Sequence, residues 1–332
     1  MSIDTIKEIR FPIQADFRDF EQAFQDALQT DNQLLSEVLD YIHTKRGKQL
    51  RPILVMLSAA VCRNITPKTI QTAVALEMLH TASLIHDDVV DDSPLRRGNN
   101  AIHTQWNNKI AVLVGDYLLA KVIEIMADVR NTAILDIVAH MGKSLASGEL
   151  LQLHRGQSMW ITENQYMKVI EQKTACLFSA CSMAGAASAG ATTRQQTAMK
   201  QFGMHLGVCF QLKDDVLDYS DIEDLGKPTM SDITDGKATL PLIISLERAT
   251  KEEAAHIREL AEALANKDPH INALETSEEI KSFILRYDGI RYAHQQMQKH
   301  RKQALETLSM FPDSKYKSAL LTLLDYTINR VY

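Results

Sequence analysis

The stretch "HDDVVDDSPLRRG" (residues 86–98) carries four aspartates, at positions 87, 88, 91 and 92. Like charges this close repel each other and destabilise a fold unless a cation offsets them. Asp87 and Asp91 are four residues apart, so on a helix they lie one turn apart on the same face, with Asp88 alongside. The flanking residues are apolar. The sequence therefore predicts a largely buried helix whose acidic face needs positive charge.

A second stretch, "QLKDDVLDY" (211–219), repeats the pattern on another apolar segment. Asp214 and Asp218 have the same spacing, and Asp215 corresponds to Asp88. One such pair would be read as a solvated helix face, but two D-D-x-x-D patterns indicate hard divalent ions. Magnesium prefers carboxylate oxygens and completes its shell with water and substrate phosphates. We expect two acidic faces opposed across a helical bundle, holding a small ion cluster that stabilises a diphosphate leaving group.

Basic residues accompany both acidic stretches. Lys48 and Arg51 lie in "GKQLRP" (47–52), where Pro52 is expected at the first position of a helix. Free backbone N–H groups at that helix end favour anions, and the two cations strengthen the site. Any one basic residue would be read as surface charge, but together they predict a cavity for two phosphorylated ligands, one held through metal. The others assigned to it are Arg96, Arg97, Lys227 and Lys237.

Helix-forming composition extends along the whole chain. The 332 residues are 45% hydrophobic, with only 13 Gly and 8 Pro, and no alternating strand pattern stands out. We expect one all-α domain over residues 1–332, with peripheral helices after about residue 251 and a punctuated, functional loop at 221–241. The expected helices are a pair within 18–44 and single ones at about 51–62, 68–92, 103–129, 132–153, 163–190, 194–219 and 239–249, followed by several more.

Several classes of protein are disfavoured. The formal net charge of −6 gives no reason to expect nucleic-acid binding, and no G-x-x-x-x-G-K-[ST] loop supports nucleotide hydrolysis. Residues 174–193 are uncharged but consist mostly of small side chains, which favours a helix buried in a bundle over a transmembrane segment. Four cysteines without a C-x-x-C motif indicate free thiols, and the N-terminus has no signal-type apolar run. These features predict a cytoplasmic protein.

The motifs resemble those of the trans-isoprenyl diphosphate synthases (polyprenyl synthetases), especially bacterial long-chain enzymes of the octaprenyl diphosphate synthase type. The resemblance runs from about residue 40 to 250. It implies an isoprenoid-synthase-type helical bundle around a central substrate cavity, usually a homodimer. Members condense an allylic diphosphate with isopentenyl diphosphate. The motifs, in the family's order, are "GKQLRP", "HTASLIHDDVVDDSPLRRG", "GDYLLA", "GELLQL", "QKTA", "FQLKDDVLDY", "LGKPTM" and "GKATLPL".

The resemblance also implies roles for individual residues. Magnesium, as a cluster of about three ions once substrate is bound, would be held by Asp87 and Asp91, with Asp88 nearby, and by Asp214 with Asp218. The residues implied to contact the allylic diphosphate, with farnesyl diphosphate as primer, are Arg96, Lys173, Lys227 and Lys237.

Isopentenyl diphosphate would be held by a second basic set, and two oxygens would lie near the developing allylic cation. The oxygens come from Thr174 and Gln211. His86 is interpreted as structural, and Asp92 receives no role. The isopentenyl diphosphate set is Lys48, Arg51, His80 and Arg97.

The punctuated loop departs from the family pattern. Met230 stands where members often carry Gly, and Ser231 where they often carry Asp, while Asp232 is retained. The departure weakens any detailed role for this loop without affecting the role of Lys227.

Product length is predicted from residues one turn deeper than the first acidic motif. Ala82 and Ser83 lie five and four positions before Asp87. In short-chain members an aromatic residue there can plug the cavity, so two small side chains favour a long apolar tail, although they also serve helix packing. The tail would lie among Met78, Leu79, Leu119, Ile123 and Met126.

Three other functions stay open. A short- or medium-chain enzyme such as a geranylgeranyl diphosphate synthase differs in product size alone. A class I terpene cyclase shares one D-D-x-x-D, but the second motif and "GKQLRP" argue for a second diphosphate substrate. A regulatory subunit of a heteromeric prenyl synthase would be expected to lose site residues, and none of the expected residues is missing here. The leading prediction is a long-chain synthase that makes a quinone side chain and whose lipid product brings it to the membrane surface.

Overall fold

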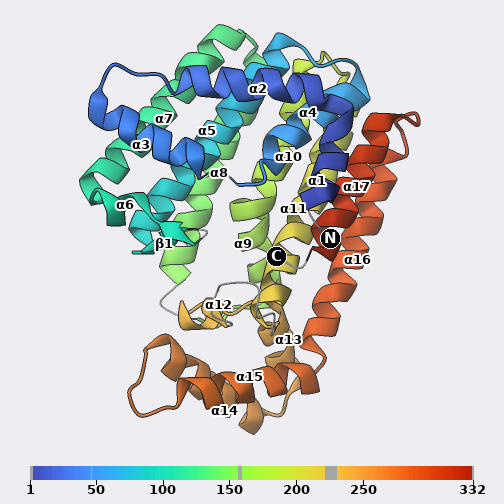
Figure 1. The fold of residues 1–332 in the computed structure, drawn as a ribbon. Coiled ribbons are helices and arrows are strands. Elements are labelled where there is room, and N and C mark those ends of the chain that lie inside the picture. Colours follow the sequence, from blue (N-terminus) through green and yellow to red (C-terminus); the bar gives the residue numbers. More distant parts are fainter. Residues whose placement is uncertain (1–2, 46, 97, 156–158, 221–229, 331–332) are drawn as a thin grey trace. The chain divides into compact units, whose positions relative to one another are not determined.

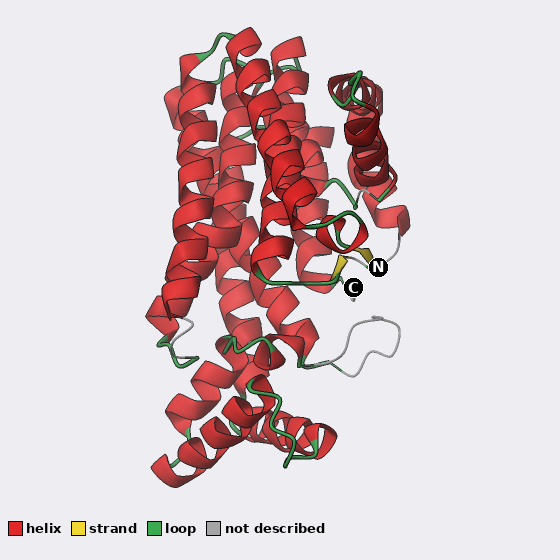
Figure 2. Cartoon of the chain, turned by 90° about the vertical axis from the view of Figure 1, so that its left-hand side faces the viewer, coloured by secondary structure: helices red, strands yellow, loops and turns green. Residues whose placement is uncertain are grey.

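The computed structural model describes residues 3–45, 47–96, 98–155, 159–220 and 230–330, and these are helical almost throughout (Figure 1). The described strands are two-residue segments, β1 (Leu95–Arg96) and β2 (Asn99–Asn100), which pair antiparallel (Figure 2). The all-α prediction is therefore confirmed, although this small hairpin was not predicted.

The helices follow one another with short connections. The first part of the chain forms α1 (Ile3–Arg10), the 3₁₀ turn η1 (Phe11–Ile13), α2 (Gln14–Ala27), α3 (Gln33–Thr44), α4 (Leu50–Cys62), α5 (Pro67–Val90), α6 (Ile102–Gln105), α7 (Asn108–Val129) and α8 (Thr132–Arg155). The rest forms α9 (Glu163–Ile170), the π-helical turn η2 (Glu171–Ala175), α10 (Cys176–Ser188), α11 (Thr193–Asp218), α12 (Ser231–Thr234), α13 (Leu240–Arg248), α14 (Lys251–Ala265), α15 (Ala273–Arg286), α16 (Gly289–Leu308) and α17 (Lys315–Asn329).

Two of the expected helices are interrupted. The segment expected at 103–129 is divided into α6 and α7, and the one at 163–190 contains the π-helical turn between α9 and α10. Pro52 is the third residue of α4 and not its first, because the helix begins at Leu50 after Gln49, whose backbone is left-handed at φ 52°.

The chain divides into two compact units. The first comprises Met1–Lys143, Leu177–Gly203 and Thr307–Leu323, and the second comprises Ser144–Cys176, Met204–Glu306 and Leu324–Tyr332. The single-domain assignment over 1–332 stays a prediction.

The core of the first unit is built around α4 and α5, which pack on each other and on α2, while α7 packs along α5 (Figure 1). Every residue of α4 from Pro52 to Val61 is buried, as expected for a helix that is apolar nearly all round. Gly115 of α7 lets α5 approach closely, because a Cβ there would lie 2.1 Å from the His86 ring. His86 thus has the structural place predicted for it.

The uncharged segment after Thr174 forms part of this core. In α10 the side chains from Leu177 to Ser188 are buried apart from Met183, and a Cβ on Gly185 would lie 2.2 Å from the Val55 carbonyl oxygen. The prediction of a buried, closely packed helix is confirmed. None of the helices in the described part of the chain is long and apolar enough to cross a membrane.

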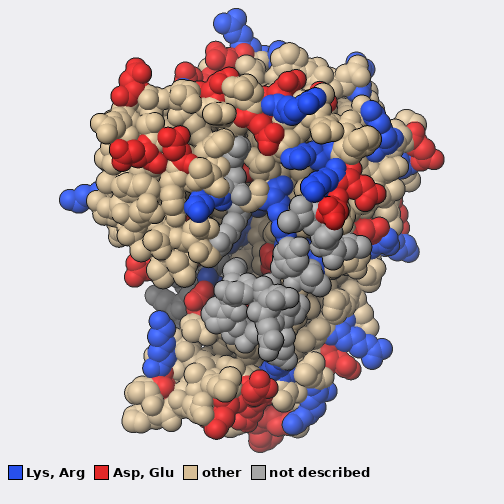
Figure 3. Space-filling view, viewed as in Figure 1, with Lys and Arg blue, Asp and Glu red and all other residues tan. Residues whose placement is uncertain are grey.

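The second unit has its own apolar core. Tyr166 of α9, Leu212 of α11 and Ile243 of α13 pack with Ile257 of α14 and Ile284 of α15. Helices α14, α15 and α16, which follow residue 251, therefore bury side chains in this core. The four cysteines are free thiols, as predicted. On the face seen in Figure 3, acidic and basic side chains are interspersed among uncharged ones.

Candidate functional site

The first acidic motif lies at the end of α5, in the first unit. Asp87 and Asp88 are in its last turn, and Asp91 is the C-cap residue, whose N–H donates to the Asp87 carbonyl at 2.8 Å. Asp92 follows with a left-handed backbone at φ 48°. Asp87 is half-buried and Asp91 is exposed, whereas Asp88 is only 4% exposed. The outer aspartates of the motif therefore reach solvent and the middle one does not.

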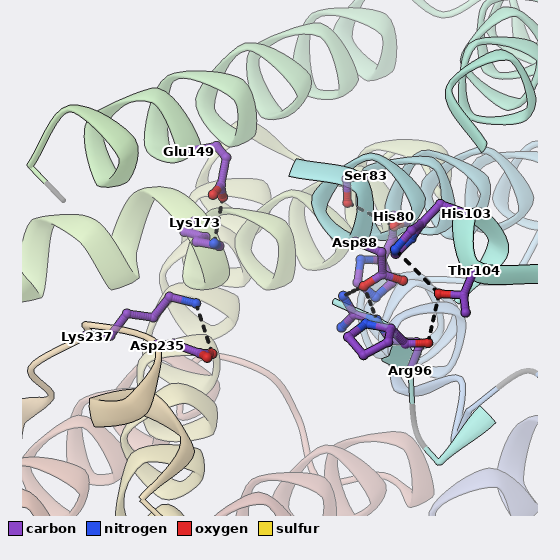
Figure 4. A network of polar contacts seen from close by, with 11 residues as sticks. His80, Ser83, Asp88, Arg96, His103, Thr104, Glu149, Lys173, Asp235 and Lys237 are labelled. Atoms are coloured by element: carbon purple, nitrogen blue, oxygen red, sulfur yellow. Dashed lines mark hydrogen bonds and ion pairs between the residues drawn. The ribbon is translucent and has the colours of Figure 1, made fainter. Parts of the chain in front are cut away.

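Arg96 offsets the charge of the buried Asp88. The guanidinium donates to Asp88 Oδ1 from Nε at 2.8 Å and also from Nη2 (Figure 4). The β1–β2 hairpin pairs Arg96 with Asn99 and so places the guanidinium over the end of α5. A buried carboxylate needs such a partner because desolvation of an isolated charge costs several kcal/mol. The structure thus brings two predicted site residues together.

A pocket that is partly open to solvent lies beside this ion pair within the first unit. His80, predicted as a ligand residue, is 7% exposed and lines the pocket with Asp88 and Arg96. Glu77 and Tyr41 also line the pocket, but neither was predicted from the sequence. Glu77 is nearly buried, and the Tyr41 hydroxyl donates to the Asn100 carbonyl at 2.8 Å. Glu77 could have been noticed in the sequence, because a single acidic residue within an apolar run is energetically unfavourable to bury.

The predicted basic residues near α4 lie at its N-terminal end, as expected. Lys48 is exposed and Arg51 is half-buried, with its guanidinium 5.2 Å from the centre of the Phe178 ring. Gly47 of the same motif lines the pocket. Arg97 lies outside the described residues.

The predicted chain-length residues differ in their surroundings. Ala82 is completely buried, and Ser83 is half-buried with its hydroxyl donating to the His80 carbonyl at 2.9 Å (Figure 4). Met126 is buried, but Ile123 is 71% exposed on the surface of α7. Ile123 therefore does not lie inside the first unit, where a tunnel wall was expected.

The second acidic motif lies at the end of α11, in the second unit. Asp214 accepts a hydrogen bond from Arg330 Nη2 at 2.7 Å. The same guanidinium lies 3.9 Å from the centre of the Phe210 ring. Arg330 carries no local sequence signal, because it is 116 residues from its partner.

Asp218 binds the start of α12. Its Oδ1 accepts from the Ser231 N–H at 3.0 Å and from the Ser231 hydroxyl at 2.6 Å, and its Oδ2 accepts from the Asp232 N–H at 3.0 Å. The family-atypical Ser231 therefore holds a predicted metal ligand. Burial, followed by the charges of Asp215 and Asp218, raises the pKa of Asp232 well above its usual value.

Asp215 is the middle aspartate of the second motif and is 1% exposed. Its carboxylate accepts hydrogen bonds from the Tyr166 hydroxyl and from Gln211 Nε2 at 2.9 Å. Gln211 Oε1 in turn accepts from the Thr174 hydroxyl at 2.7 Å, so the two predicted oxygen-bearing residues lie together. Burial raises the pKa of Asp215 to about 7, against the lowering effect of its two hydrogen bonds. Tyr166 was missed because nothing in its local sequence marks it.

The predicted lysines of the second unit are held by acidic neighbours. Lys173, in the π-helical turn, lies 2.6 Å from a Glu149 carboxylate oxygen, and Lys237 lies 3.7 Å from Asp235 (Figure 4). Glu149 belongs to the "GELLQL" motif, but sequence reasoning assigned it no role. Lys227 lies outside the described residues.

The donor chemistry of both motifs fits magnesium. Among the described residues no three His, Cys, Asp or Glu side chains converge into a ready-made metal cage. Magnesium does not need one, because it usually binds one or two carboxylates and takes its remaining ligands from water and substrate phosphates. The outer pair of each motif, Asp87 with Asp91 and Asp214 with Asp218, supplies carboxylates of this kind that reach solvent, whereas Asp88 and Asp215 are buried. In the second motif the outer carboxylates also accept hydrogen bonds from Arg330 and Ser231.

Known proteins match this chain over nearly its whole length. The family model "Polyprenyl synthetase" matches residues 32–276. An octaprenyl diphosphate synthase from Haemophilus influenzae is 34% identical over 100% of this chain and 98% of its own. A crystal structure of a polyprenyl synthase from Caulobacter crescentus, complexed with calcium and isoprenyl diphosphate, is 33% identical and covers 98% of each chain with a TM-score of 0.90.

A third match has a different product in its name. The crystal structure of a geranylgeranyl pyrophosphate synthase from Bacteroides thetaiotaomicron is 36% identical, covers 99% of this chain and 100% of its own, and has a TM-score of 0.83. These similarities confirm the predicted isoprenoid-synthase fold. The chain belongs to the polyprenyl synthetase family of prenyltransferases, as its motifs predict.

Proposed function

We propose that this chain is a long-chain trans-polyprenyl diphosphate synthase, which adds isopentenyl diphosphate units to an allylic diphosphate. The observation that carries the proposal is the difference in burial between the middle and the outer aspartates of the two D-D-x-x-D motifs. Each middle aspartate is buried, whereas the outer ones keep access to solvent at the ends of α5 and α11, although Asp214 and Asp218 also accept hydrogen bonds there. Such outer carboxylates suit ions that bind a diphosphate.

Magnesium is the proposed cofactor, held as a cluster of about three ions when substrate is bound. Asp87 and Asp91 would hold it at the first motif, and Asp214 and Asp218 at the second. When bound, it supplies positive charge that stabilises the leaving diphosphate. The Caulobacter relative, whose crystal structure contains calcium and isoprenyl diphosphate, supports this chemistry.

The basic residues bind the two diphosphates. The pocket beside His80 and Arg96 supports an anion site in the first unit, because a guanidinium lies at its wall. Isopentenyl diphosphate is assigned to Lys48, Arg51, His80 and Arg97, and the allylic diphosphate to Arg96, Lys173, Lys227 and Lys237.

The reaction requires positioning and electrostatic stabilisation, without a covalent enzyme intermediate. The allylic C–O bond breaks, and the diphosphate leaves with the bonding electrons. The double bond of isopentenyl diphosphate then attacks the allylic cation, and a proton is lost from the adjacent carbon. Oxygens of Thr174 and Gln211 stabilise the developing positive charge.

The product is proposed to be long, of the octaprenyl type, with farnesyl diphosphate as primer and a quinone side chain as its use. The small side chains of Ala82 and Ser83 and the octaprenyl synthase relative support this length. A geranylgeranyl-length product is the second candidate, favoured by the Bacteroides relative.

A homodimer in the cytoplasm is the proposed working form. Leu113 and Ile123 on α7 are 66% and 71% exposed, which suits an apolar contact with a second copy. The lipid product would bring the enzyme to the membrane surface. No nucleic-acid partner is proposed, given the net charge of −6.

The decisive experiment is an incubation of the purified chain with farnesyl diphosphate, labelled isopentenyl diphosphate and Mg²⁺, followed by product sizing. A product near eight isoprene units supports the proposal, and one of four units supports the second candidate. No product from the chain alone, but product after addition of a partner subunit, would make it a regulatory or dependent subunit.

A further inference from the structure

A chain of three hydrogen bonds connects buried residues of the second unit to the Thr174 hydroxyl. Tyr166 of α9, 4% exposed, donates to Asp215, which is 1% exposed. Gln211 donates to the other Asp215 oxygen at 2.9 Å, and Thr174 donates to Gln211 Oε1 at 2.7 Å. Because Tyr166 and Asp215 are nearly inaccessible to solvent, their roles differ from those of the outer aspartates.

The direction of these hydrogen bonds follows from the chemistry of Asp215. When Asp215 is ionised, its Oδ1 can only accept from Gln211, so the Gln211 amide turns its NH₂ group towards the carboxylate. The amide oxygen then faces Thr174, and the Thr174 hydroxyl must donate to it. Lone pairs on Gln211 Oε1 and Thr174 Oγ consequently stay available to a third group. If the Gln211 amide were reversed, its NH₂ group would face Thr174, and N–H donors would replace the lone pairs of Gln211 Oε1.

We infer that Tyr166 and Asp215 are positioning residues that fix the orientation of the Gln211 amide and, through it, of the Thr174 hydroxyl. This inference rests on the proposed function, in which these two oxygens face the developing allylic cation. Dipoles oriented before the reaction stabilise charge without reorganisation, which makes their direction important. Thr174 lies in the π-helical turn Glu171–Ala175, and such turns are frequent at functional sites.

The first test lets the hydrogen bonds of the network reverse their direction while the size and shape of the side chain at position 215 stay the same. In Asp215→Asn the new amide can donate, so Gln211 can reverse and present N–H groups to Thr174. We expect kcat to fall by about 10- to 100-fold, with KM for both diphosphates changed less than about threefold. Tyr166→Phe leaves the carboxylate less restrained and is expected to lower kcat by about 3- to 10-fold.

A charge-conserving exchange distinguishes orientation from simple structural support. In the double variant Asp215→Asn/Gln211→Glu, the new amide donates to the new carboxylate, which again can only accept from Thr174. We expect this variant to recover at least about tenfold of the kcat lost in Asp215→Asn. Loss of packing alone would make the two substitutions add, so a double variant no better than Asp215→Asn would overturn the inference.

The matched control is Tyr219→Phe. Tyr219 is as buried as Asp215, but its hydroxyl lies 2.6 Å from the neutral Thr239 hydroxyl and outside the network. It should keep kcat within about twofold while losing a comparable hydrogen bond. Unfolding midpoints and Mn²⁺ affinity, measured by electron paramagnetic resonance without turnover, should be similar in Tyr166→Phe and the control.

The outcomes separate this inference from the proposed function. If the wild-type chain makes no prenyl product, the proposed function fails. If it does, and Tyr166→Phe and Asp215→Asn keep the wild-type kcat, the positioning role alone is refuted. Should Asp215→Asn not fold, Tyr166→Phe decides: a kcat within twofold of Tyr219→Phe overturns the inference.

Discussion

The ion pair between Asp88 and Arg96 predicts a large loss of stability when its basic partner is removed. Arg96→Ala leaves a carboxylate whose side chain is 6% exposed without its guanidinium. Breaking a fully buried pair costs about 3–5 kcal/mol. Arg96 is itself 40% exposed, so water can replace part of the lost interaction. We therefore expect the free energy of unfolding to fall by about 2–3 kcal/mol.

Urea denaturation followed by circular dichroism measures this loss. The matched control is Arg301→Ala, because Arg301 and Asp325 form a pair at 2.9 Å whose side chains are 35% and 43% exposed. That pair should contribute at most about 1 kcal/mol. The double variant Arg96→Ala/Asp88→Asn should recover at least about 1 kcal/mol of the free energy of unfolding, because the buried charge is no longer present. Equal losses in Arg96→Ala and Arg301→Ala would refute the reasoning.

Three further predictions concern activity and pH. Asp87→Ala should lower kcat at least about 100-fold with little change in unfolding midpoint, and near-normal turnover would exclude the metal-binding role. Asp214→Ala should lower kcat by a similar factor but should also lower the unfolding midpoint, because it leaves the buried Arg330 guanidinium without its carboxylate. Ala82→Phe should shorten the product on chromatography, whereas an unchanged product would argue against a tail beside this residue. Burial, followed by the charge of His205, lowers the pKa of His300 to about 4. Because the unfolded imidazole titrates near 6.5, stability should be lost as the pH falls from about 6.5 towards 4, and His300→Gln should flatten that part of the urea-midpoint profile.

The helical architecture was predictable because its signals are local. Apolar side chains recur at helical spacing, and Pro67 and Thr66 mark the start of α5. The β1–β2 hairpin was missed because two-residue strands show no alternation. The π-helical turn escaped for a similar reason: one extra residue per turn hardly changes a periodic pattern.

The site was predictable in part. Spacing places the outer aspartates of each motif on one helical face, and that inference needs no tertiary information. The separate role of Asp88 and Asp215 depends on partners elsewhere in the chain. Arg96 is eight residues from Asp88, and Tyr166 is 49 from Asp215, so only the folded structure reveals these contacts. For the same reason Arg330 could not be assigned to Asp214.

The contacts of Asp218 have a consequence for the interpretation of its variants. Its backbone carbonyl accepts from the Met230 N–H at 2.9 Å, and its carboxylate accepts from Ser231 and Asp232. One residue thus ties the end of α11 to the start of α12. Substitution of Asp218 would remove a proposed metal ligand and the hydrogen bonds that hold α12 at the same time. Loss of activity in an Asp218 variant would therefore not by itself identify metal binding.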